Sequence, residues 1–500
     1  MGLTSRRKFL TRAGGAGVAA TTAIPAPAGQ PLALPSASSR PNVLLVMTDQ
    51  HRADAMGAYG NKVIHTPNLD SLAKGGVLFT ECWVQHPVCM PSRASIFTGR
   101  YPSAHRVRTN GVSLPRSEKT LAQVFLEGGH RTGGAGKFHF VPHLNRELPI
   151  METHPDPFYG FQEFHLGEDG RLGEQALWIK RQHPEYAGKP DNEIPVELHN
   201  TYWTASHTIN FIRESVRRNQ PFFAFCSFVD PHHSYNPPPP YRDMYKEQEM
   251  PAALARTGEL EDKPPFFKEW SNNYRRLEAR LAYHRTQYYG EVTFIDDSIG
   301  RLLNVLKELR ILENTLVVFT SDHGDMLGDH GMFYKGPFHY RACTNTPLII
   351  HWPGHVLPGK RIAGIVQEID LLPTILDLAA IPCPPGVQGK SQKAVLSTNA
   401  TGTGYSSALI EHGTSGATAP KLGREEGLPD VYTIRSSKWR LSYYPGQDYG
   451  EIYDLGNDPD EFINRWRDPA IEPVKRRLKD ELLDRVLAAH DPLPVREEWF

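Results

Sequence analysis

The sequence predicts an α/β fold with a doubly wound, mostly parallel sheet and a small α+β part at the C-terminal end. Continuous apolar runs, typical of strands buried on both faces of a parallel sheet, alternate along the chain with helical patterns. Polar clusters follow four of these runs, and functional groups collect at the carboxyl ends of strands in such sheets. A change of pattern from about residue 386 indicates the smaller second part.

Four apolar runs are the predicted strands of the large sheet: residues 42–48, 130–136, 221–229 and 315–320. The polar residues that follow them are Asp49; Lys137 and His139; Asp230, Pro231, His232 and His233; and Ser321, Asp322, His323 and Gly324. Because the carboxyl ends of neighbouring parallel strands meet at one edge, we expect these side chains to share one site.

Helical patterns at residues 121–126, 209–212 and 294–306 precede three of these strands. Residues 145–200 and 236–275 are polar, rich in proline and weakly periodic, and we expect loops or insertions around the site there. In the C-terminal part, residues 431–435 and 439–444 are typical of short antiparallel strands, and residues 474–489 of an amphipathic helix.

The N-terminal segment has the pattern of an export signal. Ser5-Arg6-Arg7-Lys8-Phe9-Leu10 is a twin-arginine pattern, a weakly apolar run follows, and Ala26-Pro27-Ala28 is a cleavage site. The run is too short and too poor in Leu and Ile to span a membrane. We therefore expect a signal peptide (1–28), a linker (29–40), a catalytic domain (41–385) and a C-terminal subdomain (386–500), in a protein exported to the periplasm or beyond.

Composition narrows the function classes. The formal net charge is −1 and no basic stripe stands out, so the sequence does not indicate nucleic-acid binding. The five cysteines are an odd number for an exported chain, and they form neither a C-x-x-C pair nor a disulfide framework. The sequence thus indicates no zinc site and leaves a cysteine that needs another role.

That cysteine lies in the segment Cys89-Met90-Pro91-Ser92-Arg93, which continues to Thr98-Gly99-Arg100. The segment resembles the signature that directs oxidation of cysteine to formylglycine in type I sulfatases, within the alkaline-phosphatase-like superfamily. Nearly the whole chain after the leader is similar to that family, in these further segments: 40–50, 65–70, Gly136-Lys137-Phe138-His139 (with Phe for Trp), 230–232, 321–324, 334–336 and 450–459.

The resemblance implies a hydrolase of sulfate esters with an alkaline-phosphatase-like fold. It implies a divalent metal ion bound by Asp49, Asp322, His323 and an oxygen of the formylglycine at position 89. Oxygen-dominated ligands favour a hard cation such as Ca²⁺, our first expectation, or Mg²⁺, and the imidazole leaves Mn²⁺ open. Charge that develops on the sulfate oxygens and the leaving group is stabilised by such a cation and by ammonium groups.

The resemblance also assigns the remaining roles. One hydroxyl of hydrated formylglycine attacks sulfur, and His232 protonates the departing alcohol as general acid. His139 is the base that removes a proton from the second hydroxyl. Lys137 and Lys335 hold sulfate oxygens, and Arg93 orients the formylglycine. A formylglycine-generating enzyme is the expected maturation partner.

Two positions depart from the family's common pattern. Asp49-Gln50 stands where many members have Asp-Asp, and Asp322-His323 stands where many have Asp-Asn. The combination is similar to choline sulfatases and to formylglycine-dependent phosphonate monoester and phosphodiester hydrolases, so such a hydrolase remains the main alternative. A transferase and an inactive protein that binds sulfated glycans are further alternatives. A metal contact from the Gln50 amide oxygen also stays open.

Substrate identity depends on the loops. Arg106, Arg108 and Asn110 follow the signature and could bind a carboxylate or hydroxyl of a sugar, although surface charge explains them equally well. His330, His339 and His412 are weaker candidates, and packing within the loop is the simpler role for His233. Export and long polar loops favour a sulfated polysaccharide or its fragments, with small aryl or alkyl sulfates open and no indication of oligomeric state.

Overall fold

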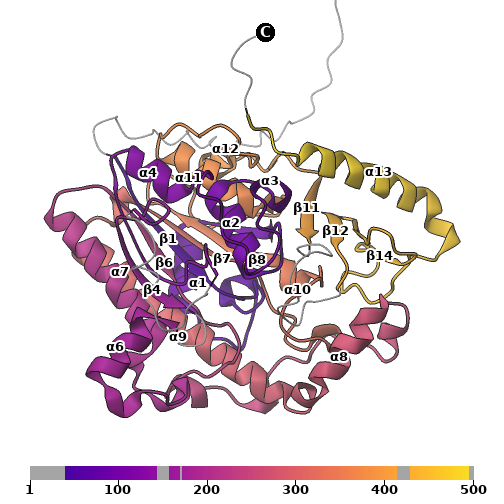
Figure 1. Cartoon of the computed structure of the whole chain (residues 1–500), viewed down its shortest axis with the longest axis horizontal. Coiled ribbons are helices and arrows are strands. Elements are labelled where there is room, and N and C mark those ends of the chain that lie inside the picture. Colours follow the sequence, from indigo (N-terminus) through magenta and orange to yellow (C-terminus); the bar gives the residue numbers. More distant parts are fainter. Residues whose placement is uncertain (1–39, 143–156, 169–171, 414–427, 495–500) are drawn as a thin grey trace, which may run out of the picture. The chain divides into compact units, whose positions relative to one another are not determined.

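The computed structural model describes residues 40–142, 157–168, 172–413 and 428–494 (Figure 1). The predicted signal peptide and residues 29–39 of the linker lie outside the described residues. No helix in the described part of the chain is long and apolar enough to cross a membrane.

The large sheet has the strand order β10-β2-β8-β7-β1-β6-β3-β4-β5, with β9 paired to β2. Strands β7, β1, β6, β3 and β4 are parallel neighbours, and β8 runs antiparallel to β7 and β2. The mostly parallel sheet predicted from the apolar runs is thus confirmed. Its strands are β1 (Asn42–Thr48), β2 (Val77–Trp83), β3 (Arg131–Gly136), β4 (Glu163–Glu168), β5 (Leu172–Gly173), β6 (Phe222–Ser227), β7 (Thr315–Ser321), β8 (Asn345–His351), β9 (Lys360–Ile362) and β10 (Val366–Gln367).

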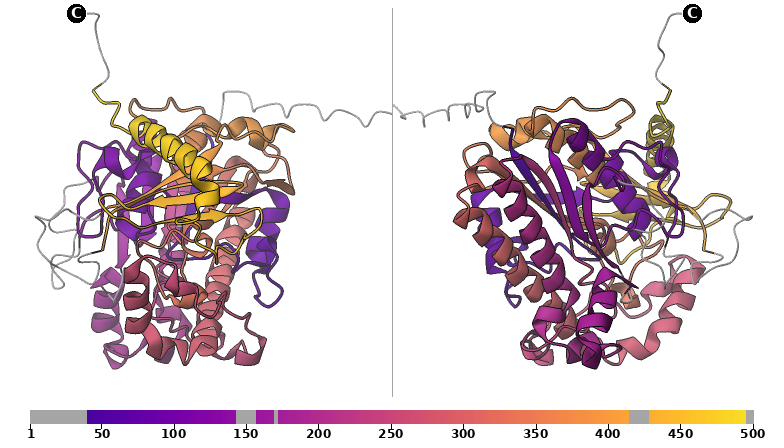
Figure 2. Two further views of the ribbon diagram at one scale, coloured as in Figure 1. Left: turned by 90° about the vertical axis from the view of Figure 1, so that its right-hand side faces the viewer. Right: turned by 60° about the vertical axis from the view of Figure 1, so that its left-hand side comes forward.

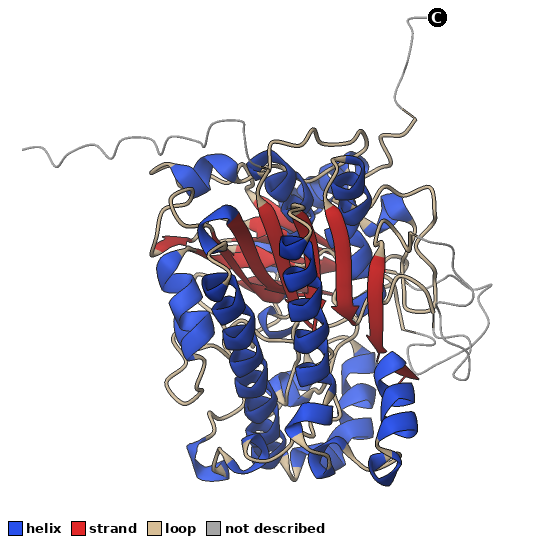
Figure 3. Ribbon diagram, turned by 90° about the vertical axis from the view of Figure 1, so that its left-hand side faces the viewer, coloured by secondary structure: helices blue, strands red, loops and turns tan. Residues whose placement is uncertain are grey.

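Helices cover both faces of this sheet, as a doubly wound fold requires. One apolar cluster joins α1 (Pro67–Gly75), α7 (Asn200–Arg217) and α9 (Leu281–Glu308) to one face. Another joins α2 (Cys89–Thr98), α4 (Leu121–Glu127) and α11 (Leu371–Leu378) to the other face. Figure 3 shows long helices lying in front of the strands.

The C-terminal part contains a second, antiparallel sheet in the order β11-β12-β13-β14. Its strands are β11 (Ser407–His412), β12 (Val431–Ser436), β13 (Trp439–Tyr443) and β14 (Gly450–Asp454). Helix α13 (Glu472–Ala488) packs on this sheet through Leu478 and Leu482 and is the yellow helix of Figure 2. The two predicted strands and the amphipathic helix are confirmed.

The prediction of loops at 145–200 and 236–275 is partly wrong. Strand β4 pairs with β3 in the large sheet, and α6 (Glu174–Gln182) follows it. Helix α8 (Pro265–Glu278) lies across the end of the second segment and buries Phe267, Trp270 and Tyr274. These aromatic residues stand at helical spacing within a polar stretch, so the helix depends on tertiary burial of one narrow face. Elsewhere in the described residues, the short helices are α3 (Pro102–His105), α10 (Arg341–Thr344) and α12 (Lys393–Ser397), and several 3₁₀ turns connect the elements.

The strand order brings the predicted polar ends together. Strands β7, β1, β6 and β3 are consecutive, and all four are parallel. In the β1–β7 register Thr48 pairs with Ser321, so Asp49 and Asp322 follow two paired residues. The four run ends therefore lie along one edge of the sheet, as the sequence predicts.

Candidate active site and metal centre

Cys89 is the first residue of α2, a helix whose ten residues are all buried. Val88 precedes it in an extended conformation, with φ −139° and ψ 145°, so the helix begins abruptly at Cys89. Its other end is Gly99, whose φ of 66° is the left-handed conformation common after helices. The signature segment thus forms a buried helix with Cys89 in its first turn.

Four buried side chains converge at the sheet edge: Asp49, Cys89, Asp322 and His323. One ligand atom from each lies within 4.8 Å of the others. Cys89 Sγ lies 3.2 Å from His323 Nε2 and 3.7 Å from Asp49 Oδ1. The structure therefore brings together the four residues that the sequence resemblance assigns to a metal ion.

The segment after β7 is held by a close backbone approach at Gly324. Its N–H donates to the Cys343 carbonyl at 2.8 Å, and a Cβ at Gly324 would lie 2.0 Å from the Ala342 carbonyl oxygen. Asp322 N–H donates to the Thr48 carbonyl at 3.1 Å. Glycine is thus required for the turn that directs Asp322 and His323 toward β1.

Arg93 binds both carboxylates of the cluster from the next turn of α2. Its Nε donates to Asp322 Oδ2 at 2.7 Å, and Nη2 donates to Asp49 Oδ2 at 3.2 Å. Nη1 donates to Ser227 Oγ at 2.9 Å and to the Lys137 carbonyl. A planar guanidinium suits this bridging role because its donors point in fixed directions.

Lys137 and Lys335 approach Cys89 from two sides. Lys137 Nζ lies 2.6 Å from Asp49 Oδ2 and 3.8 Å from Cys89 Sγ. Lys335 Nζ lies 2.9 Å from Cys89 Sγ. Gly136 makes the approach of Lys137 feasible, because at its φ of 96° a Cβ would lie 1.8 Å from the Ser227 carbonyl oxygen. The site thus holds two ammonium groups beside the end of the residue-89 side chain.

Burial and neighbouring charges shift the pKa values of the cluster residues in different directions. Burial alone would raise the pKa of Asp49, but the neighbouring cations, above all Lys137, hold this pKa well below its usual value. Burial raises the pKa of the Cys89 thiol to about 12, and Asp49 adds to the shift. Burial lowers the pKa of His323 against the opposing effect of Asp322. At neutral pH the cluster combines a carboxylate, a neutral thiol and a neutral imidazole.

The orientation of His323 tests whether this set fits a metal ion. Its Nδ1 lies 2.9 Å from the Gly324 carbonyl, which can only accept, so Nδ1 carries the proton. The Nε2 lone pair then faces Asp49 Oδ1 and Asp322 Oδ1, both at 3.7 Å. Converging lone pairs repel one another unless a cation lies between them. The donor set therefore fits a divalent ion, and its oxygen and imidazole chemistry suits Ca²⁺, Mg²⁺ or Mn²⁺.

The two predicted proton-transfer histidines follow β3 and β6, two strands whose carboxyl ends lie at the same edge of the sheet as the cluster. His139 is buried, and its backbone N–H donates to Glu168 Oε1 at 3.2 Å. His232 is half-buried, and its charge is among the causes of the low Asp49 pKa. The His233 ring stacks on His232 at 4.2 Å and also contacts the Gln50 amide. His233 thus packs within the loop, as predicted, and reaches the site as well.

The three residues after the signature that were candidates for substrate binding have different surroundings in the structure. Asn110 Oδ1 accepts from the Met90 N–H at 3.0 Å, directly beside Cys89. Arg108 is half-buried and donates to the Tyr432 hydroxyl at 2.8 Å, on β12 of the small sheet. Arg106 is exposed, with a φ of 69°. Asn110 therefore has the most direct connection to the signature helix.

His339 and His412 lie in a buried histidine cluster with His86. The rings of His86 and His412 are 4.7 Å apart, and those of His339 and His412 are 6.4 Å apart. His86 precedes Cys89 by three residues and donates Nε2 to the Arg108 carbonyl at 3.1 Å. Burial lowers the pKa of His412 to about 4, so the cluster is neutral at physiological pH.

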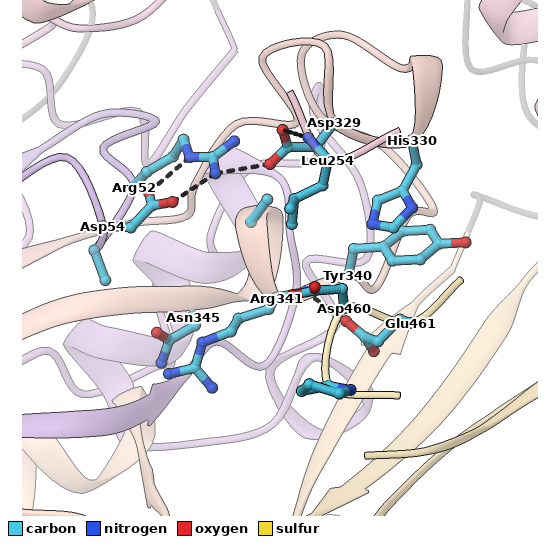
Figure 4. Close-up of a pocket in the computed structure, with 13 residues that line it drawn as sticks. Arg52, Asp54, Leu254, Asp329, His330, Tyr340, Arg341, Asn345, Asp460 and Glu461 are labelled. Atoms are coloured by element: carbon cyan, nitrogen blue, oxygen red, sulfur yellow. Dashed lines mark hydrogen bonds and ion pairs between the residues drawn. The ribbon is translucent and has the colours of Figure 1, made fainter. Parts of the chain in front are cut away.

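His330 lines a separate cavity of about 80 Å³ that none of the four cluster residues borders (Figure 4). Arg52 spans its wall, with Nη2 2.7 Å from Asp54 and 2.8 Å from Asp329. The His330 ring stacks on Tyr340 at 4.1 Å. The cavity wall is held by internal ion pairs, and His330 packs there instead of facing Cys89.

Two acidic residues near the site were not predicted from the sequence. Glu368 Oε2 lies 2.9 Å from Ser92 Oγ, which donates to the Asp322 carbonyl at 2.6 Å. Asp325 accepts from the Gln50 amide. No motif marks Glu368, whereas Asp325 directly follows the polar segment after β7 and could have been found there.

Comparison with known proteins identifies the family of the chain. The family model described as Sulfatase matches residues 41–381, and that described as N-sulphoglucosamine sulphohydrolase, C-terminal, matches residues 328–487. An arylsulfatase of Clostridium perfringens is 32% identical over 456 residues, which cover 85% of this chain and 90% of that protein. An N-acetylglucosamine-6-O-sulfatase of Bacteroides thetaiotaomicron is 26% identical over 493 residues, covering 85% and 83%.

Among solved structures, the phosphonate monoester hydrolase of Agrobacterium radiobacter superposes with a TM-score of 0.79 at 25% identity. The match covers 92% of this chain and 98% of that one. The predicted resemblance and the alkaline-phosphatase-like fold are thus confirmed. The chain belongs to the sulfatase family and is a hydrolase that acts on sulfuric esters.

Proposed function

We propose that this sulfatase cleaves carbohydrate sulfate esters, with formylglycine made from Cys89 as nucleophile and a divalent metal ion as cofactor. The observation that carries the proposal is the convergence of Asp49, Cys89, Asp322 and His323 within 4.8 Å. Conversion replaces the cysteine –CH₂–SH by –CHO: water supplies the oxygen, sulfur leaves as hydrogen sulfide, and two electrons and two protons pass to an oxidant, dioxygen. A formylglycine-generating enzyme catalyses this oxidation.

Asp49, Asp322 and His323 would hold the ion together with residue 89. A bound divalent ion supplies positive charge that stabilises developing negative charge on substrate oxygens. Arg93 fixes both carboxylates in place through Nε and Nη2, at 2.7 Å and 3.2 Å. The ligand carboxylates are thus oriented before substrate binds, and such preorganisation lowers the cost of reorganisation during the reaction.

Lys137 and Lys335 bind the nonbridging oxygens of the sulfate. Their Nζ atoms lie 3.8 Å and 2.9 Å from Cys89 Sγ, so a group attacked by residue 89 lies within reach of both. The two ammonium groups stabilise the charge that grows on these oxygens as the ester bond breaks.

His232 and His139 move the protons. His232 Nδ1 lies 2.7 Å from the His233 carbonyl, which can only accept, so Nε2 is the atom that gives a proton to the departing alcohol. Attack leaves the sulfate on one oxygen of residue 89. His139 then accepts the proton of the second hydroxyl, the C–O bond to the sulfate breaks, sulfate leaves and the aldehyde is restored. The buried backbone of His139 is held by Glu168.

A second candidate activity is hydrolysis of phosphonate monoesters or phosphodiesters at the same site. It is favoured by the Asp49-Gln50 and Asp322-His323 pairs and by the TM-score of 0.79 to a phosphonate monoester hydrolase. The similarity to the N-acetylglucosamine-6-O-sulfatase over 85% of this chain supports the carbohydrate sulfate instead.

One preparation tests both candidates. Mass spectrometry first verifies conversion of Cys89, and turnover of an aryl sulfate and of a phosphonate monoester is then measured, with Cys89→Ala as control. We expect a higher kcat/KM for the sulfate and loss of turnover in the control. Preference for the phosphonate would overturn the sulfate assignment and retain the nucleophile. Positive turnover of sulfated disaccharides then identifies the sugar.

Export by the twin-arginine route is part of the proposal, supported by Arg6, Arg7 and the Ala26-Pro27-Ala28 site. It predicts a periplasmic or extracellular protein that begins near residue 29. Replacement of both arginines by lysine retains the precursor in the cytoplasm if the route is correct. The division into a catalytic domain (41–385) and a C-terminal subdomain (386–500) is likewise proposed, and limited proteolysis near residue 386 tests it.

A further inference from the structure

The side-chain amide of Gln50 lies between a carboxylate and an ammonium group. Its Nε2 donates to Asp325 Oδ2, and its Oε1 accepts from Lys335 Nζ at 3.1 Å. Lys335 Nζ also lies 2.9 Å from Cys89 Sγ. The orientation of one amide therefore decides whether an oxygen or an N–H group faces the ammonium beside residue 89.

The backbone of Gln50 is held in place by hydrogen bonds on both of its polar groups. Its N–H donates to Asp322 Oδ1 at 3.0 Å, and its carbonyl accepts from the Tyr288 hydroxyl at 2.8 Å. The residue adopts a φ of 67°, a conformation that few non-glycine residues hold. The backbone is thus fixed, the side chain is fully buried, and the end-for-end orientation of its amide depends on the groups around it.

Asp325 allows one of the two amide orientations. Its Oδ1 accepts from the backbone N–H groups of Leu327 and Tyr334 at 2.7 Å and 3.0 Å. Its Oδ2 accepts from the Tyr235 hydroxyl and from Gln50 Nε2. A carboxylate can only accept, so the nitrogen end of the amide must face it.

The His233 ring, which also contacts the amide, does not impose an orientation. His233 Nδ1 lies 3.2 Å from Gln50 Nε2 and 3.3 Å from Gln50 Oε1. A ring nitrogen can donate or accept according to its tautomer, so it accommodates either end. Lys335 can only donate and therefore favours the same orientation, but its ammonium lies at the end of a flexible side chain. Asp325 is held by two backbone N–H groups and is therefore the rigid group that sets the amide.

We propose that Asp325 is a positioning residue: it orients the Gln50 amide so that the amide oxygen, and not the nitrogen, faces Lys335 and the metal cluster. The proposal rests on the proposed function of the cluster as a metal-dependent site. It gives Gln50 the role of a neutral oxygen donor, where many members of the family have an aspartate. Residue 50 then positions the Lys335 ammonium without adding negative charge.

The variant Asp325→Asn tests this directly. The backbone N–H groups of Leu327 and Tyr334 cannot turn, so the new amide oxygen takes their side and the new NH₂ group faces Gln50. The Gln50 amide then faces a donor at both ends, so its oxygen can no longer accept from Lys335 without an unfavourable contact between the NH₂ groups at positions 50 and 325. We expect metal affinity, measured by calorimetry on the apoprotein, to fall about 10- to 100-fold, the usual cost of losing a group that orients a ligand site.

Gln50→Glu supplies the reciprocal change. As a single variant, Gln50→Glu places a second carboxylate beside that of Asp325, and we expect their repulsion to weaken metal binding. In the double variant the NH₂ group introduced at position 325 meets a carboxylate oxygen at position 50, and the other oxygen faces Lys335. We expect the double variant to bind metal about tenfold more tightly than addition of the two single free-energy changes predicts. Purely additive losses would overturn the proposal, as would an unchanged affinity in the first variant.

Tyr235→Phe is the matched control, because it removes a donor to the same Asp325 oxygen without changing which end of the Gln50 amide that oxygen accepts. We expect it to lower the melting temperature and leave metal affinity within about twofold. If its affinity falls as far as that of Asp325→Asn, loosening of the loop explains the data and the proposal is wrong. The two proposals fail by different measurements. Absence of sulfate turnover in the parent protein contradicts the proposed function, whereas the metal affinities of the variants test the role of Asp325.

Discussion

Arg93 Nε donates to Asp322 Oδ2 over 2.7 Å, and neither side chain is exposed. The same guanidinium donates to Asp49 at 3.2 Å, so one buried cation holds both carboxylates of the cluster. Breaking a buried ion pair costs more than an exposed one, because the remaining charge is left without solvent.

Replacing Arg93 by Gln is therefore expected to destabilise the metal-free protein by about 3–5 kcal/mol. Bound metal neutralises the same carboxylates, so we expect a smaller loss in the metal-loaded protein. Urea unfolding in chelator and in metal measures both. Arg217→Gln, at a side chain 74% exposed, is the control and should change stability by less than about 0.5 kcal/mol. Equal losses in both states contradict the bridging role.

Lys335→Met is expected to lower kcat/KM for an aryl sulfate about 10²- to 10³-fold, the typical cost of removing one donor to a developing oxyanion. Its Nζ lies 2.9 Å from Cys89 Sγ, within reach of a sulfate attacked there. Lys246→Met is the matched control, since that side chain is 77% exposed. Turnover unchanged in Lys335→Met shows that this ammonium does not hold the sulfate.

The small sheet depends on a buried ion pair between Arg440 and Glu451, 2.7 Å apart. Glu451 also accepts from Tyr444 and Tyr453, while Arg440 has a second carboxylate in Glu461 at 3.2 Å. Arg440→Met strands a buried carboxylate, and we expect it to cost about 3–5 kcal/mol. Glu451→Gln leaves Arg440 paired and should cost less. Thermal unfolding of both variants measures the two losses of stability. A larger loss in Glu451→Gln than in Arg440→Met would refute this prediction.

His412 predicts a loss of stability in acid. Burial lowers its pKa to about 4, below the ordinary 6.5. The unfolded chain thus binds a proton that the folded chain does not as pH falls from 6.5 toward 4. The free energy of unfolding is therefore unaffected by His412 above pH 6.5, and protonation of this residue in the unfolded chain lowers it by about 2 kcal/mol at pH 5.

His412→Phe removes this titration together with two buried nitrogens that have no hydrogen-bond partner among the described residues. We expect its free energy of unfolding to fall about 2 kcal/mol less than that of the parent between pH 7 and pH 5. His490→Phe, at an exposed position, serves as control. Parallel pH profiles for parent and His412→Phe would exclude a neutral His412 in the folded state.

The large sheet and the cluster were predictable because their signals are local. β1 and β7 are buried along their whole length around a central apolar run, and the acid that enters the site directly follows each strand. β2 was not predicted because Thr80 and Glu81 interrupt its apolar residues. Helix α8 was not predicted because only Phe267, Trp270 and Tyr274 are buried in it. These elements depend on tertiary burial, which composition alone does not reveal.

The supporting contacts of the site were beyond sequence reasoning for a related reason. Gln50 meets Asp325 across 275 residues, and Ser92 meets Glu368 across 276. Such pairs follow from strand order and register, which single-sequence patterns do not give. The cluster residues were found because each stands at a strand end or in the signature segment.

In the proposed function, Asp49, Asp322, His323 and residue 89 hold one divalent ion on which sulfate ester hydrolysis depends. The most direct measurement removes metal with a chelator and titrates Ca²⁺, Mg²⁺ and Mn²⁺ back, recording bound metal and aryl sulfate turnover together. We predict that turnover is lost without metal and returns in proportion to bound metal, up to one ion per chain, and that Asp322→Asn weakens both. Full turnover by the metal-free protein would contradict the account.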